Sequence, residues 1–181
     1  RQVGRWIKQY RAAETEVYPE IESLITWLED NMPGDDGMIS IVHGDYRLYN
    51  MIFNHSENKI LAVLDWELST IGHPYADLAY QCMNWYIPKI GITPGLYGLN
   101  LEGTGIPTEE EYIESYCNKM GIDHIPNWPF YLAFGFFRLA GIAQGVYKRS
   151  IMGNASAKNA GELGAAVPIL GKIANDIIQS K

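Results

Sequence analysis

The sequence is poor in the features that mark several specialised classes of protein. It has only two cysteines, Cys82 and Cys117, both in apolar, helix-like surroundings. This argues against a disulfide framework and predicts two buried free thiols. No apolar run reaches the ~18 residues of a membrane helix, and no signal-peptide pattern opens the chain. A reducing, intracellular compartment, by default the cytoplasm, is therefore expected.

Basic residues are also scarce. The 14 Lys and Arg residues are outnumbered by 21 Asp and Glu, which gives a net charge of −7 and a pI near 5.0. A basic surface is what non-specific nucleic-acid binding requires, so this partner is not expected. The two cysteines lie far apart with no paired histidines, which makes a four-ligand zinc site improbable.

One segment carries a chemically specific pattern. Residues 43–50 read HGDYRLYN and residues 64–67 read LDWE, which spaces Asp45, Asn50 and Asp65 along the chain. One carboxylate can orient a hydroxyl nucleophile and accept its proton, while an amide and a second carboxylate can hold the Mg²⁺ that neutralises phosphate charge. The pattern therefore favours phosphoryl transfer.

A β-hairpin is expected to bring these residues together. Residues 51–54 and 59–64 are apolar enough for two strands, and the residues between them are polar and turn-like. If the hairpin is centred near Glu57, the numbers of paired residues sum to about 114. Asn50 then lies opposite Leu64 and Asp65, with cross-strand neighbours ~5 Å apart.

Each acid has an ordinary structural explanation when taken singly. His-Gly-Asp triplets often form turns, and an aspartate after a strand is often a cap. The combination is more specific, because a strand at 39–42, the loop, the hairpin and Asp65 follow in the order that the chemistry needs. Gly44 permits an unusual backbone angle just before Asp45.

Neighbouring residues leave alternatives open. Glu67 could adjust a magnesium ion or be a plain surface acid. Arg47 could neutralise phosphate or acceptor charge, since its planar fork suits such anions, or it could form a salt bridge to a helix. His43 is expected to hydrogen-bond the backbone near the loop and so support Asp45.

In this order the motifs resemble the carboxyl-terminal lobe of the aminoglycoside phosphotransferase and choline kinase family, which is related to the protein kinases. That family's signature is H-G-D-x-x-x-x-N, then a strand ending in I/L-D-W/F-E. Residues 72–79, GHPYADLA, are similar to its G-x-P-x-x-D-L-A stretch. The resemblance implies Asp45 as catalytic base, Asn50 and Asp65 as ligands for magnesium and hence for ATP, and Asp77 as a brace of the catalytic loop.

Two further stretches resemble one branch of this family. Residues 5–10, RWIKQY, and residues 137–149, FRLAGIAQGVYKR, with GNAS at 153–156, look like the branch found fused to, or encoded near, acyl-CoA dehydrogenases. This branch implies a hydroxyl acceptor from acyl or hydroxyacyl metabolism rather than an antibiotic.

The resemblance also implies an amino-terminal lobe with a Gly-rich loop, a strand lysine and a helix glutamate. Ahead of His43 there is no Gly-x-Gly-x-x-Gly, the only lysine is Lys8 in a helical pattern, and the first residue is not Met. We therefore expect a fragment whose nucleotide-binding lobe is missing and belongs to the same parent protein. The isolated lobe should bind ATP poorly.

The overall pattern predicts an α+β fold over residues 1–181 as a single domain: a mostly helical, kinase-like carboxyl-terminal lobe with one small hairpin sheet that carries the catalytic loop. Pro19 is expected in a helix's first turn, and Thr108 and Glu111 form a capping box. The expected helices are 2–13, 17–31, 76–86, 108–120, 127–150 and 157–178, with a long loop at 87–107 that could shape the acceptor pocket.

The leading hypothesis is an ATP- and magnesium-dependent kinase for a small-molecule hydroxyl group. The alternative is a non-catalytic, pseudokinase-like binding or regulatory module, which the missing lobe favours and the retained acids oppose. A metal-dependent phosphohydrolase using Asp45, Asp65 and His73 is a weaker reading, because such sites usually group more His and Asp ligands.

Overall fold

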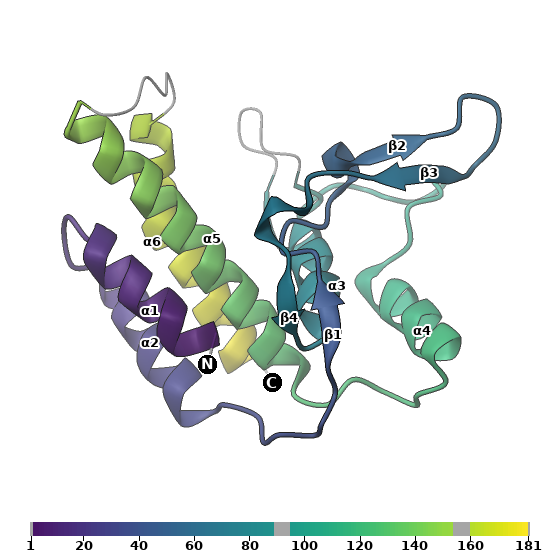
Figure 1. The fold of residues 1–181 in the computed structure, drawn as a ribbon, viewed down its shortest axis with the longest axis horizontal. Helices are drawn as coiled ribbons and strands as arrows, with labels where there is room; N and C mark the ends of the chain where they lie inside the picture. The colour runs from purple at the N-terminus through teal and green to yellow at the C-terminus, as the bar shows by residue number, and fades with distance from the viewer. Residues whose placement is uncertain (1, 89–94, 154–159, 181) are drawn as a thin grey trace. The chain divides into compact units, whose positions relative to one another are not determined.

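The chain divides into two compact units. The computed structural model describes residues 2–88, 95–153 and 160–180 (Figure 1). Unit 1 comprises residues 1–34 and 127–181, and unit 2 comprises residues 35–126. Helices dominate and the strands are few and short, which confirms the predicted α+β class.

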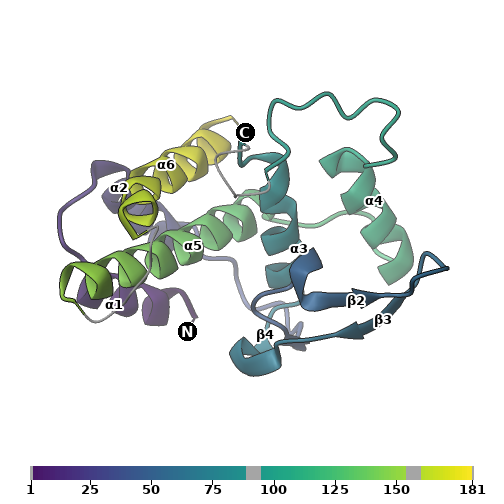
Figure 2. The same cartoon turned by 90° about the horizontal axis from the view of Figure 1, so that it is seen from above.

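Unit 1 is built from four helices, α1 (Gln2–Ala13), α2 (Pro19–Asp30), α5 (Trp128–Ile151) and α6 (Ala160–Gln179). The long helices α5 and α6 lie side by side, with α1 along α5 and α2 against both (Figures 1 and 2). Pro19 occupies the first turn of α2 as predicted, where its missing N–H costs no hydrogen bond.

The core of unit 1 lies between these helices. Tyr10 of α1 and Phe137 of α5 are fully buried, with ring centroids 5.8 Å apart. Arg138 of α5 is charged, yet it is only 8% exposed, and its guanidinium lies 5.2 Å from the ring centre of Trp6. This cation–π contact lets a charged side chain lie within an aromatic helix face.

Unit 2 contains short strands and helices in close succession. Two antiparallel strand pairs, β1 with β4 and β2 with β3, replace the single small sheet that was expected. The elements are β1 (Ser40–Val42), η1 (Leu48–Asn50), β2 (Met51–Phe53), β3 (Ile60–Val63), η2 (Trp66–Leu68), β4 (Thr70–Gly72), α3 (Tyr75–Cys82), η3 (Met83–Trp85) and α4 (Glu109–Met120).

The register of the β2–β3 hairpin confirms the prediction. Met51 pairs with Val63, and an irregularity shifts the register only at Phe53. The hairpin continues one step beyond the strands, because the Leu64 N–H donates to the Asn50 carbonyl oxygen at 2.8 Å. Asn50 and the residue before Asp65 therefore lie at the same end of the hairpin.

Other expectations differ from the structure mainly at boundaries. The helix expected over 76–86 begins at Tyr75 and tightens into the 3₁₀ turn η3 at Met83. Residues 95–107 contain no helix of their own, in line with the expected loop, whereas residues 89–94 lie outside the described residues. The first three residues of the helix expected over 157–178 also lie outside them, and α6 begins at Ala160.

The capping box and the two buried free thiols are found where the sequence predicts them. The Thr108 hydroxyl accepts from the Glu111 N–H, and the Glu111 carboxylate accepts from the Thr108 N–H, so the capping box opens α4. Cys82 and Cys117 are both buried free thiols, and burial raises the pKa of Cys82. Among the described residues, no helix combines the length and apolar character that a membrane crossing needs.

Candidate active site

Three segments of unit 2 converge on Asp45. They are the loop from His43 to Asn50, the turn from Leu64 to Leu68 at the end of β3, and the first two turns of α3. The loop follows the buried end of β1, and Asn50 closes the 3₁₀ turn η1 immediately before β2. His43, Asp45 and Asn50 are all buried, although each is polar, so their hydrogen bonds determine whether this arrangement is stable.

The Asp45 side chain is held from several sides. Its Oδ1 accepts a hydrogen bond from the Tyr80 hydroxyl at 2.9 Å. Its Oδ2 accepts from the Asn50 side-chain amide at 2.8 Å and lies 3.0 Å from Nη2 of Arg47. The same Asn50 amide also donates to the Asp45 carbonyl oxygen at 2.9 Å. The carboxylate is therefore oriented before any ligand binds.

The His43 ring connects the loop to the end of β3. Its Nδ1 accepts from the Asp45 backbone N–H at 3.2 Å, so the ring proton belongs on Nε2, which donates to the Leu64 carbonyl oxygen at 2.8 Å. The ring also packs 4.6 Å from the Trp66 ring. His43 thus supports the backbone on either side of the candidate site, as the sequence predicted.

Asp77 binds the backbone at the start of the loop. Its two carboxylate oxygens accept from consecutive N–H groups, those of His43 at 2.6 Å and Gly44 at 2.9 Å. Gly44 has φ +87°, and a Cβ placed there would lie 2.6 Å from the Leu68 carbonyl oxygen. Only glycine suits this position, because it tolerates the backbone angle and leaves room for Leu68.

Asn50 and Asp65 lie at the same end of the hairpin and offer oxygen ligands. The Asn50 amide nitrogen donates to Asp45, so its Oδ1 is not used in that contact. Asp65 is exposed and has φ 66° and ψ 52°, a left-handed conformation that aspartate tolerates better than most residues. An amide oxygen with a carboxylate fits Mg²⁺, which usually takes one or two carboxylates and completes its shell with water and phosphate.

The remaining predicted residues, Arg47 and Glu67, are more exposed than Asp45. Arg47 is half exposed beside Asp45, which is the ion pair in place of the helix salt bridge considered above. Glu67 lies exposed in η2, and its role stays a prediction. Tyr80 was not predicted at all. The sequence did contain a signal for it: Tyr80 lies three positions after Asp77, and residues three apart share one face of a helix.

His73 does not join this cluster. Its Nε2 lies 3.1 Å from Oδ2 of Asp36, and its Nδ1 accepts from the Tyr75 N–H. The Met38 N–H and then the His73 ring hold the pKa of Asp36 below its usual value. Within residues 2–88, 95–153 and 160–180, no three His, Cys, Asp or Glu side chains form a metal-binding group.

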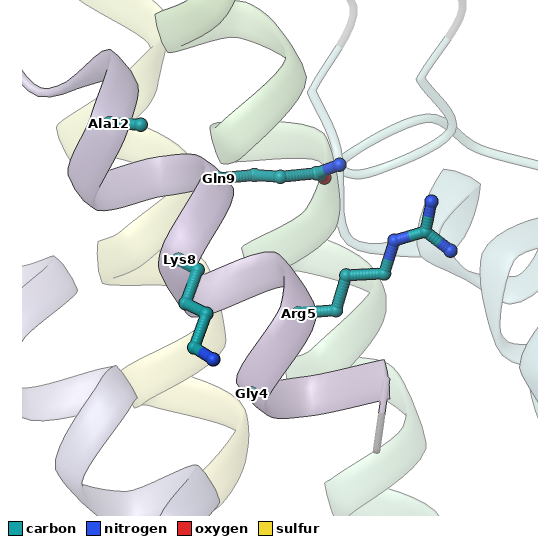
Figure 3. A pocket seen from close by; sticks show the side chains of 5 residues that line it. All are labelled: Gly4, Arg5, Lys8, Gln9 and Ala12. Atoms are coloured by element: carbon teal, nitrogen blue, oxygen red, sulfur yellow. The ribbon is translucent and has the colours of Figure 1, made fainter.

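A separate pocket lies in unit 1. It has a volume of about 550 Å³ and follows one face of α1 (Figure 3). Its lining residues are Gly4, Arg5, Lys8, Gln9 and Ala12, none of which belongs to the site around Asp45.

Known proteins resemble the chain in both sequence and structure. A profile of the family described as "Phosphotransferase enzyme family" matches residues 1–111. The crystal structure of an inferred aminoglycoside phosphotransferase from Ralstonia eutropha JMP134 superposes with a TM-score of 0.92 at 43% identity, over 99% of this chain and 54% of that one. These findings confirm the predicted resemblance and the fold.

The relatives also confirm the predicted branch. Mouse acyl-CoA dehydrogenase family member 10 is 49% identical over 177 residues, which is 97% of this chain and 16% of that protein. Human acyl-CoA dehydrogenase family member 11 is 46% identical over 162 residues, covering 88% of this chain and 20% of that protein. The chain therefore spans a fifth or less of the length of these two relatives.

Proposed function

This chain belongs to the phosphotransferase enzyme family, and from that premise we propose that it forms the catalytic and metal-binding lobe of a kinase for small-molecule hydroxyl groups. ATP is the proposed phosphoryl donor. The observation that carries the proposal is the buried Asp45 carboxylate, whose two oxygens are held by Tyr80 and Asn50. Asp45 therefore keeps one orientation in which it can meet an acceptor hydroxyl.

Asp45 is proposed as the general base. It accepts the proton of the acceptor hydroxyl as the acceptor oxygen bonds to the γ-phosphorus, while the bond from phosphorus to the bridging oxygen of ATP breaks and its electron pair leaves with ADP. Holding the reacting groups in place and neutralising charge supply most of the rate in such reactions. Arg47, already paired with Asp45, could contribute charge to the phosphoryl group.

Asn50 and Asp65 are proposed to hold Mg²⁺, and Glu67 could adjust it. When bound, the ion would supply positive charge to the phosphate oxygens. The backbone bond between Asn50 and Leu64 supports this role, because it keeps the amide and the Asp65 backbone at one end of the hairpin. Asp77 is proposed to brace the loop through its bonds to His43 and Gly44.

The proposed acceptor is a hydroxyacyl compound. Its support is the likeness to proteins named as acyl-CoA dehydrogenase family members. The nucleotide lobe is proposed to lie in the rest of a longer parent protein, since the chain covers only part of each relative and 54% of the Ralstonia chain.

The test is Mg²⁺-dependent transfer of the ATP γ-phosphate by the full-length parent protein. The acceptor panel contains hydroxyacyl thioesters, amino sugars and amino alcohols. We expect Asp45→Asn to abolish transfer and retain Mg-ATP binding, and Asp65→Asn to weaken Mg-ATP binding at least tenfold, in line with loss of a metal ligand.

Glu114→Gln, at an exposed position of α4, serves as a charge-matched control. Transfer to hydroxyacyl thioesters alone would identify the acceptor class, and transfer to amino sugars instead would overturn that part of the proposal. Tight Mg-ATP binding without transfer to any acceptor would favour the non-catalytic module. Unchanged nucleotide binding in Asp65→Asn would overturn the metal assignment.

A further inference from the structure

Tyr80 links helix α3 to the Asp45 side chain. Its hydroxyl donates to Oδ1 of Asp45 at 2.9 Å across 35 positions of sequence. Asp77 lies three residues earlier on the same helix and binds the backbone of residues 43 and 44. One face of α3 therefore holds both the backbone at the start of the loop and the carboxylate of Asp45.

The hydrogen bonds divide unequally between the two oxygens of Asp45. An ionised carboxylate offers about four lone-pair positions, roughly two on each oxygen. Oδ2 meets two donors, the Asn50 amide at 2.8 Å and the Arg47 guanidinium at 3.0 Å. Among the described residues, Oδ1 accepts from Tyr80 alone. One position on Oδ1 thus remains for a further donor.

We propose that Tyr80 is a positioning residue for phosphoryl transfer, an inference that rests on the function proposed above. Tyr80 occupies one side of Oδ1 and directs the other side toward the acceptor. The acceptor hydroxyl donates its hydrogen bond to this open side, and its proton moves to Oδ1 as the acceptor oxygen bonds to the γ-phosphorus of the nucleoside triphosphate. The nucleoside diphosphate leaves with the electron pair of the broken bond.

The same hydrogen bond predicts how catalysis and nucleotide binding should separate. Tyr80 contacts the Asp45 carboxylate, whereas the proposed metal ligand Asn50 closes the same loop. Removing only the Tyr80 hydroxyl should therefore lower kcat and leave Mg-ATP binding unchanged. A residue that only packed against the loop would disturb Asn50 as well, and would weaken Mg-ATP binding together with kcat.

The test compares Tyr80→Phe with Tyr86→Phe in the full-length parent protein. Tyr86 is the matched control, because its hydroxyl also donates to a carboxylate, that of Glu109, in the same unit. Each variant loses one oxygen and keeps its ring. The measurements are kcat for Mg-ATP with the best acceptor of the panel, and Mg-ATP binding at equilibrium.

For Tyr80→Phe we expect a kcat about tenfold lower, in line with a small misplacement of a reacting group. We also expect a Kd for Mg-ATP within about twofold of wild type, because nucleotide ligands are untouched. Tyr86→Phe should match wild type in both measurements.

The outcomes separate the two proposals. If wild type and Tyr86→Phe transfer phosphate and Tyr80→Phe does so with the same kcat, the positioning role is overturned and the proposed function stands. A lower kcat with Mg-ATP binding weakened by a similar factor also overturns it, because that result marks a packing role. If wild type transfers phosphate to no acceptor, the proposed function fails first and the role of Tyr80 falls with it.

Discussion

The His43 ring donates through Nε2 to the carbonyl oxygen of Leu64 at 2.8 Å. This single contact joins the loop that carries Asp45 to the residue that precedes Asp65. Because both ring nitrogens are used, Nδ1 toward the Asp45 N–H and Nε2 toward Leu64, the ring connects the two ends of the candidate site.

Replacing His43 with Phe should separate this polar connection from ring packing. Phenylalanine can keep the contact with Trp66 but leaves the Leu64 carbonyl and the Asp45 N–H without the ring's hydrogen bonds. We expect a loss of about 1–3 kcal/mol in the free energy of unfolding, measured in urea. His124→Phe, at an exposed position, should change it by less than ~0.5 kcal/mol. Equal effects would contradict this account.

Gly44→Ala tests the close approach of the catalytic loop to Leu68. The alanine Cβ would meet the Leu68 carbonyl oxygen at 2.6 Å and would also sit at φ +87°. Gly103→Ala is the control, since Gly103 has φ +71° with nothing within 4 Å. Both variants should lose ~1 kcal/mol for the backbone angle, and Gly44→Ala a further ~1–3 kcal/mol for overpacking. Identical thermal unfolding curves for the two variants would exclude the steric explanation.

Asp77→Asn tests how strongly the carboxylate braces the loop. The amide keeps one acceptor oxygen but places an NH₂ group against the second backbone N–H. We expect a destabilisation of about 1.5–3 kcal/mol, as for hydrogen bonds to charged groups. Asp176→Asn breaks only the exposed ion pair with Lys172 and should cost less than ~0.5 kcal/mol. Urea unfolding measures both variants. An Asp77→Asn variant as stable as wild type would contradict the bracing role of Asp77.

The pair between Arg11 and Glu22 predicts a pH dependence of stability in unit 1. The guanidinium of Arg11 hydrogen-bonds both carboxylate oxygens, with Nη2 to Oε2 at 2.7 Å, and this holds the pKa of Glu22 below its usual value. Between the folded and the unfolded pKa of Glu22, the unfolded chain binds more protons than the folded chain. The free energy of unfolding therefore rises with pH in this interval. The contribution is present above the unfolded pKa and is lost as the pH falls through the folded one.

Glu22→Gln should therefore be less stable than wild type by about 0.5–1 kcal/mol at neutral pH, a modest value because the side chain is 38% exposed. The difference should shrink as the pH falls below the ordinary glutamate value, and also in high salt. Urea titrations from acidic to neutral pH measure it. A difference that stays constant over this range would show that charge is not its source.

Local features of the sequence were sufficient for the hairpin. Its turn residues, apolar strands and short loop favour one register, so the sequence alone predicts that Asn50 lies opposite Leu64. The β1–β4 pair was missed because Thr70–Gly72 is three residues long and carries no strand signal of its own. Its pairing depends on β1, almost thirty positions earlier along the chain.

Sequence alone therefore determined the chemistry that is present: a glycine before Asp45, and an amide and an acid at one end of a hairpin. Each of these features follows from a local sequence pattern, because spacing along a strand or turn determines where a residue lies. Only the tertiary structure decided what holds Asp45. Tyr80 and Asp77 reach the loop from a helix more than thirty positions away, and Arg138 lies beside Trp6 from another element altogether. Such contacts depend on how elements pack, because burial requires each polar group to find its partner in space.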